Sequence, residues 1–150
     1  MEAGLTVARY EQAQFTELLG ARLAADIKSA RENQTLDIDA LVAPSAVSKP
    51  FAEMVDRAGP FGPGNPEPVF ALADMRVGAM KTVGKGHVSL TLHSGTGESV
   101  RAIAFRAEEN GLATFFAERG RVHVAGKIRA DDWRGGDAGQ FQILDAARAE

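Results

Sequence analysis

Residues 60–70 read Pro-Phe-Gly-Pro-Gly-Asn-Pro-Glu-Pro-Val-Phe, and this stretch separates two kinds of sequence. Four of the six prolines of the chain and two of its glycines lie within it. Neither a helix nor a paired strand can run through such a segment, because proline lacks the backbone N–H and restricts the residue before it. The sequence therefore predicts a stiff, shaped connector, with helices before it and strands after it.

The residues before the connector show helical periodicity. Apolar side chains recur at helical spacing with charged residues opposite, which predicts a first helix from about Ala8 to Ala30. A short alternating segment follows at 36–42 and is typical of a strand. Ser48 as an N-cap, with Pro50 in the first turn, then indicates a second helix that ends before Gly59.

The residues after the connector alternate between apolar and polar side chains, as strands do when one face is wet. Five segments read as strands, at about 69–80, 87–93, 99–106, 121–130 and 140–145, with a helix near 108–118. Periodicity alone leaves several small barrels open. A helix between the third and fourth of five strands is the layout of an OB-fold barrel. This order, together with the family resemblance given below, favours an α+β, mainly β chain: a five-stranded OB-fold barrel preceded by a helical lead-in.

Composition limits the class of protein. The chain has 150 residues, of which 45% are hydrophobic and 25% charged, so it is long enough and apolar enough for a globular core. No apolar run approaches the roughly 18 residues of a membrane span, and no signal-peptide pattern opens the sequence. With no cysteine either, the expected location is the cytoplasm, without contact to a membrane.

The connector also carries a family resemblance. Its pattern Pro-Phe-Gly-x-Gly-Asn-Pro-x-Pro-x-Phe resembles the segment that leads into the OB domain of the RecJ family of single-strand-specific DNA exonucleases. The matching residues are Pro60, Phe61, Gly62, Gly64, Asn65, Pro66, Pro68 and Phe70. Residues 3–7, Ala-Gly-Leu-Thr-Val, look like the tail of the DHHA1-domain signature of that family. The run 123–126, followed by Asp132 and Trp133, is similar to the fourth barrel strand.

The resemblance implies that the two parts of the chain have different roles. Residues 1–59 would be a helical docking segment following a DHHA1 domain, and residues 60–150 an OB-fold nucleic-acid-binding domain. Family members degrade single-stranded DNA from its 5′ end in repair and recombination, with Mg²⁺ or Mn²⁺ expected in a DHH domain. These 150 residues contain no such metal-binding motif, so the expectation is no catalytic residue, no metal and no cofactor in this part. The implied partners are single-stranded DNA, the DHH and DHHA1 domains, and the single-stranded-DNA-binding protein.

The charge distribution gives the candidate binding residues. The net charge of −3 argues against a nucleic-acid partner, yet residues 76–106 hold five Lys/Arg against one acidic residue, Glu98. An OB barrel binds across its second and third strands, between the loops that join strands 1–2 and 4–5. Those loops are expected at 81–86 and 131–136, and the second contains the only tryptophan. The candidates are Arg76, Lys81, Lys85, His87, Arg101, Arg106, Lys127, Arg129, Trp133 and Arg134.

Simpler interpretations remain open for these residues. Charged side chains on solvated strand faces are common, and a lone tryptophan after a strand often plugs the barrel. The same basic surface suits a protein-interaction module that binds an acidic peptide. A small standalone phosphoesterase using His87 or His123 is a further alternative, although neither histidine has an acidic partner at ligand spacing.

Overall fold

The computed structural model describes residues 12–32, 35–131 and 137–150. The chain divides into two compact units, residues 1–36 and 37–150. In the first, helix α1 (Gln12–Glu32) occupies most of the predicted helical range. Its Leu18, Leu19 and Leu23 are exposed, and its docking role stays a prediction. None of the described helices is long and apolar enough to cross a membrane.

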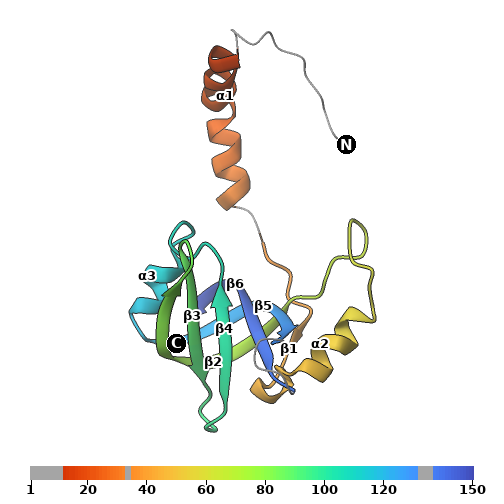
Figure 1. Cartoon of the computed structure of the whole chain (residues 1–150). Helices are drawn as coiled ribbons and strands as arrows, with labels where there is room; N and C mark the ends of the chain where they lie inside the picture. The colour runs from red at the N-terminus through yellow and green to blue at the C-terminus, as the bar shows by residue number, and fades with distance from the viewer. Residues whose placement is uncertain (1–11, 33–34, 132–136) are drawn as a thin grey trace. The chain divides into compact units, whose positions relative to one another are not determined.

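The described residues of the second unit form one short strand, one 3₁₀ turn, two helices and five longer strands. In chain order these are β1 (Ala40–Leu41), η1 (Pro44–Ala46), α2 (Lys49–Asp56), β2 (Phe70–Val83), β3 (His87–His93), β4 (Ser99–Ala104), α3 (Leu112–Ala117), β5 (Arg121–Ala130) and β6 (Gly139–Arg148). The five predicted strands and the helix between the third and fourth are all present (Figure 1), but β2 and β6 extend about three residues beyond their predicted ends and α3 is shorter than the predicted helix.

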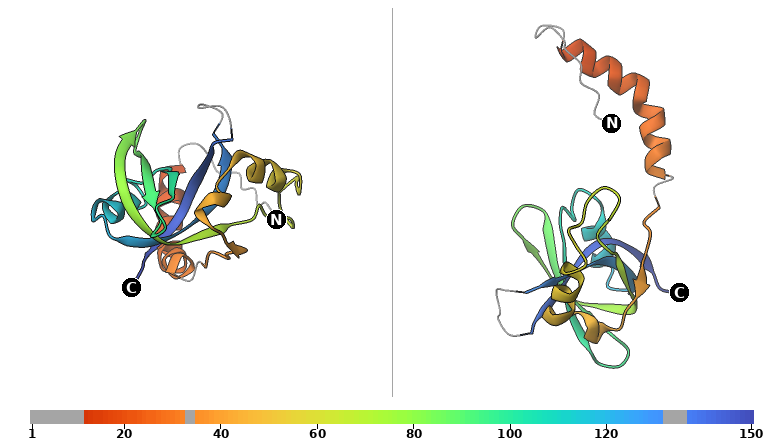
Figure 2. Two further views of the ribbon diagram at one scale, coloured as in Figure 1. Left: turned by 90° about the horizontal axis from the view of Figure 1, so that it is seen from below. Right: turned by 90° about the vertical axis from the view of Figure 1, so that its right-hand side faces the viewer.

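The five long strands close into a barrel. β2 pairs with β3 through its second half and with β5 through its first half, both antiparallel. β3 pairs antiparallel with β4, β4 runs parallel to β6, and β6 returns antiparallel to β5. Figure 2 shows how strongly β2 curves to serve both neighbours. This closed mixed barrel with an inserted helix is the predicted OB-type fold.

The core fills the barrel with the inward residues of every strand. Phe116 of α3 and Phe141 of β6 are fully buried, and α3 packs its apolar side against the barrel interior. β5 and β6 approach closely at a bulge beside Gly126, where a Cβ would lie 2.1 Å from the carbonyl oxygen of Gln142. The outward residues alternate with these core positions, so the strand pattern also determines which side chains face solvent.

Residues 37–58 pack onto the same barrel. Parallel pairing joins β1 to the start of β2, and the Asp39 carboxylate accepts a hydrogen bond of 2.8 Å from the N–H of Val69. The Ser48 hydroxyl accepts the N–H of Phe51, as an N-cap does, and the Phe51 ring meets Phe70 edge-on at 5.4 Å. The compact unit therefore begins at residue 37 and includes residues 37–59, which were predicted to belong to the helical docking segment.

Candidate nucleic-acid interface

The outward sides of β3 and β4 form one continuous surface, here called the β3–β4 face. Cross-strand pairs place Ser89 opposite Ile103 and Thr91 opposite Arg101. Figure 1 looks onto these strands, with α2 and α3 at either side of them. The surface consists of His87, Ser89, Thr91, His93, Ser99, Arg101, Ile103 and Phe105, none of which is buried. It corresponds to the two strands on which OB folds bind their ligands.

An exposed aromatic ring lies at one end of the β3–β4 face. Phe105 is 44% exposed and contacts the His87 ring edge-on, with 5.1 Å between ring centroids. His87 is held in place because its Nδ1 accepts the backbone N–H of Arg106 at 3.0 Å. The contact with His87 thus orients the Phe105 ring, and Phe105 remains partly exposed to solvent. His87 was among the predicted contacts but Phe105 was not, although the outward alternation through Arg101 and Ile103 points to it.

Four of the predicted cations make no ion pair within residues 12–32, 35–131 and 137–150. Lys81 lies near the end of β2 and Lys85 in the β2–β3 turn, while Arg106 follows Phe105. Arg76 lies further back along β2, and all four are exposed. Lys81, Lys85 and Arg106 surround the same end of the barrel as Phe105, because the β2–β3 turn contacts the segment after β4 through Glu108 and Gly86.

Two other predicted cations are neutralised. Lys127 and Arg129 of β5 both contact the carboxylate of Glu67, and these three residues are here called the Glu67 cluster. The Lys127 Nζ and an Arg129 guanidinium nitrogen each donate to one carboxylate oxygen at 2.8 Å, and Arg129 also binds the other oxygen. Burial would raise the pKa of Glu67, but hydrogen bonds from Arg129 and Lys127 outweigh it and hold the pKa below its usual value. Glu67 is therefore a carboxylate at neutral pH.

Arg101 is partly engaged as well. Its guanidinium donates to the carboxylate of Asp131, the one charged residue that is buried in the described part of the chain. Arg101 itself remains 38% exposed at the middle of the β3–β4 face. Trp133 and Arg134, predicted to contact nucleic acid, lie outside the described residues. The described site therefore contains an exposed phenylalanine, four cations without an ion pair, and three cations that are bound to carboxylates.

A metal site is not visible in this region. No group of three or more histidine, aspartate or glutamate side chains is close enough to hold a metal ion in the described residues. His87 and His123 instead accept backbone hydrogen bonds, His87 from Arg106 and His123 from Asp74 at 3.2 Å. The exposed Phe105 ring and the cations without an ion pair in the described residues suit binding to a polyanion whose aromatic rings are exposed.

Solved structures share this fold. RecJ from Thermus thermophilus, crystallised with Mn²⁺, aligns with a TM-score of 0.54 at 24% identity, over 89% of this chain and 20% of that one. The same protein crystallised with Mg²⁺ aligns with a TM-score of 0.51 at 21% identity, over 89% of this chain and 21% of that one. The chain thus spans about a fifth of the length of these RecJ chains. At these identities the likeness shows a common fold.

The family comparison covers most of the compact second unit. No curated protein matches the chain. The family model described as the RecJ OB domain matches residues 38–145, which include nearly all of the barrel and the segment that carries β1 and α2. The match begins just after the start of the second unit at residue 37. By this match over more than half of its residues, the chain belongs to the RecJ OB domain family.

Proposed function

We propose that this chain is the strand-binding and strand-guiding part of a RecJ-like 5′–3′ exonuclease that acts on single-stranded DNA in repair and recombination. The metal chemistry would belong to a DHH domain with Mg²⁺ or Mn²⁺, and none of that domain's residues is among these 150. By itself the chain is expected to bind DNA without cutting it, in the cytoplasm. Membership of the RecJ OB domain family supports this role.

The observation that carries the proposal is the exposed Phe105 ring beside cations that have no ion pair in the described residues. A nucleic-acid base can stack on an exposed ring whatever its identity, with a gain of about 1 to 3 kcal/mol per base. Lys81, Lys85 and Arg106 lie at the same end of the barrel and can neutralise the phosphates on either side of a stacked base. A duplex hides its bases, so this combination favours a single strand.

The test replaces Phe105 with alanine and measures binding of labelled oligonucleotides at several salt concentrations. We expect single-strand affinity to fall by about 1 to 3 kcal/mol. The dependence of affinity on salt should not change, because stacking releases no counterions. Leu144→Ala is the matched control, since Leu144 is an exposed apolar residue of β6 outside the β3–β4 face, 39% exposed against 44% for Phe105. Equal affinities for wild type, Phe105→Ala and Leu144→Ala would refute stacking on this ring.

An acidic peptide is the second candidate ligand. The apolar Ile103 and Phe105 lie among cations, which also suits a short acidic segment with an apolar residue, such as the tail of the single-stranded-DNA-binding protein. Competition distinguishes the two ligands. If such a peptide binds and oligonucleotides do not, the chain is an interaction module; if both bind and displace one another, they share the β3–β4 face.

A further inference from the structure

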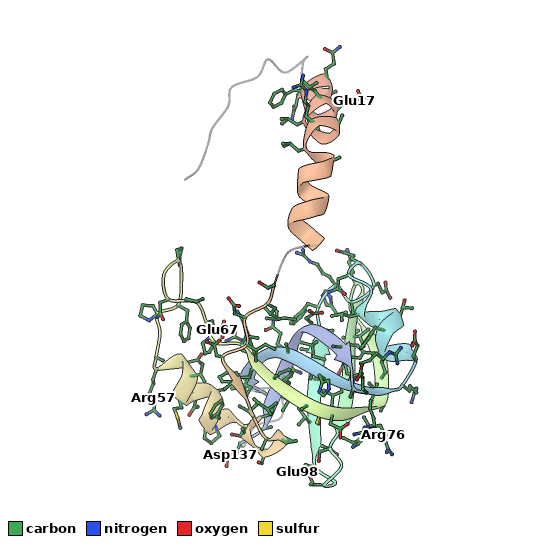
Figure 3. The ribbon with its side chains drawn as sticks, turned by 180° about the vertical axis from the view of Figure 1, so that it is seen from behind. Glu17, Arg57, Glu67, Arg76, Glu98 and Asp137 are labelled. Carbon is green, nitrogen blue, oxygen red and sulfur yellow. The ribbon has the colours of Figure 1, made fainter. Side chains whose placement is uncertain are left out.

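A small pocket opens at the opposite end of β3 from Phe105. It has a volume of about 260 Å³ and is here called the Arg76 pocket. Its lining residues come from β2, β3, β5 and the β3–β4 hairpin, and are Asp74, Arg76, His93, Ser94, Gly95 and Arg121. In Figure 3, Arg76 of β2 and Glu98 of the β3–β4 hairpin lie toward the same end of the barrel. The volume is below the roughly 300 Å³ at which pockets for drug-sized ligands begin, so a small polar group fits it better.

Two arginines face each other across the strands of this pocket. Arg76 of β2 is in register with Arg121 of β5 on one side and with His93 of β3 on the other. Like charges directly opposite one another destabilise a sheet unless an anion lies between them. Arg121 has such an anion in Asp74, but Arg76 makes no ion pair in the described residues. The charge balance therefore leaves room for one further anion.

The backbone is shaped around this charge arrangement. A bulge in β2 between Leu72 and Met75 places Asp74 at φ 54°, a conformation that a non-glycine residue adopts only when its surroundings hold it there. Both oxygens of its carboxylate accept hydrogen bonds from Arg121, through Nε and Nη2. Hydrogen bonding to Arg121 also lowers the pKa of Asp74. Arg121 is thereby oriented while its Nη1 has no hydrogen bond to the described residues.

The side of the pocket formed by His93 depends on the lack of a side chain at Gly78. The His93 ring lies over Gly78, where a Cβ would be 2.4 Å from Nε2 of the ring. Its Nδ1 shares a hydrogen bond of 2.8 Å with the Ser99 hydroxyl, which fixes the ring from the other edge. Gly78 therefore allows His93 to sit beside Arg76. Two adjustments, the bulge at Asp74 and the glycine, thus bring basic groups around one small cavity.

We propose that the Arg76 pocket binds a phosphate group of the nucleic-acid strand that lies on the β3–β4 face. Arg76 would supply the main charge, and Arg121 would donate from the guanidinium edge that Asp74 leaves open. Guanidinium groups match phosphate oxygens in charge and geometry, and such charge-assisted hydrogen bonds are stronger than neutral ones. The proposal rests on the proposed function, since it takes the phosphate from a bound strand. His87 and His93 lie about 20 Å apart along β3, so the pocket marks the far end of the path that begins at Phe105.

The first experiment probes the pocket without a strand. Inorganic phosphate is titrated into the full chain, with sodium chloride adjusted to hold ionic strength constant, while backbone and arginine side-chain N–H signals are followed by NMR. We expect saturable shifts at Gly95 and at the Arg76 and Arg121 guanidinium groups. Arg76→Gln should abolish the Gly95 shift, whereas Arg57→Gln, which removes an exposed arginine at the end of α2, should preserve it. Equal shifts in wild type and Arg76→Gln would overturn the proposal. Arg76→Gln is preferred to Arg121→Gln because it breaks no ion pair in the described residues.

The second experiment uses oligonucleotides of one sequence with a 5′-hydroxyl, a 5′-phosphate or a 3′-phosphate end. If the pocket takes an internal phosphate, Arg76→Gln should weaken all three about tenfold at low salt and flatten the log–log salt slope by about 0.7. If it takes a terminal phosphate, only the oligonucleotide with that phosphate should lose affinity in the variant. Wild-type affinity and slope for all three in Arg76→Gln, together with a loss in Phe105→Ala, would overturn the pocket and leave the proposed function intact. If the chain binds phosphate in the Arg76 pocket but binds none of the oligonucleotides, the proposed function would be overturned and the anion site would stand.

Discussion

The β2–β3 hairpin and strand β5 each contribute two cations to the predicted basic surface, but only the cations of β5 are paired with a carboxylate in the described residues. Lys81 and Lys85 are exposed and have no ion pair in the described residues. Lys127 and Arg129 are 25% and 39% exposed and share the carboxylate of Glu67, which is 13% exposed. The first pair is available to phosphates and the second already has its anion. Counting basic residues along a sequence therefore overestimates a nucleic-acid surface when another segment supplies carboxylates.

The largest expected effect comes from removing the free pair. Each contact with a single strand contributes about −0.7 to the log–log salt slope, so Lys81→Gln with Lys85→Gln should flatten it by about 1.4. If the variant and the wild type bind equally at 1 M salt, this difference in slope makes the affinity of the variant at 50 mM salt lower by a factor on the order of 50. Oligonucleotide titrations at four or more salt concentrations measure it, with Arg57→Gln as an exposed-charge control. A slope equal to that of wild type would show that Lys81 and Lys85 do not contact the strand.

Removing the neutralised pair should affect folding more than binding. Lys127→Gln with Arg129→Gln leaves the Glu67 carboxylate partly buried without its cations, at a cost on the order of 1 to 3 kcal/mol in the free energy of unfolding. The salt slope for single strands should stay close to that of wild type. Urea unfolding gives the stability, and adding Glu67→Gln to the double variant should recover most of the loss. If stability is retained but the slope flattens, the two pairs of cations are equivalent after all.

Releasing the neutralised pair is a smaller change in the opposite direction. Glu67→Gln should free Lys127 and leave Arg129 with only the 4.0 Å ion pair to Asp56. Single-strand affinity should then rise about threefold at low salt, and the slope should steepen by up to about 0.7. The gain is modest because β5 lies outside the β3–β4 face. Asp137→Asn removes an exposed carboxylate of the β5–β6 loop and serves as the control for net charge. An equal gain in both variants would mean that net charge alone, and not the Glu67 cluster, limits affinity.

The smallest expected effect is a pH dependence of stability. The pKa of Glu67 is lower in the folded chain than its usual value of 4.5, so its ionised form favours folding. That contribution is fully present above about pH 4.5 and is lost as the pH falls through the lower folded-state value. Thermal unfolding at intervals between pH 7 and pH 3 should show wild type losing its advantage over Glu67→Gln in this range. A constant difference between the two proteins would show that the ion pairs of Glu67 contribute nothing.

Periodicity was sufficient to predict the strands of the barrel, and their order together with the family resemblance predicted the OB-type fold. The alternation in β3 and β5 correctly separated core residues such as Val88 and Val124 from outward ones. The bulge at Asp74 was not predictable in this way, because an inserted residue shifts the inside–outside alternation and no composition signal marks it. The Glu67 cluster could not be predicted either, because Lys127 and Arg129 lie 60 and 62 residues after Glu67 in the sequence. Phe105 could have been found by extending the outward alternation one position beyond β4.

The hydrogen bonds between Asp39 and Val69 also determine where this unit can be cut from a longer chain. Asp39 both donates its N–H to the Val69 carbonyl and accepts the Val69 N–H on its side chain, just before β1 pairs with Phe70 and Ala71. β3 covers only the later part of β2, so truncation at residue 60 would expose a backbone edge at the start of that strand. Unpaired strand edges recruit other chains, and a protein trimmed there should self-associate and precipitate. A protein that starts at residue 37 retains the edge-covering segment and should remain monodisperse in sedimentation.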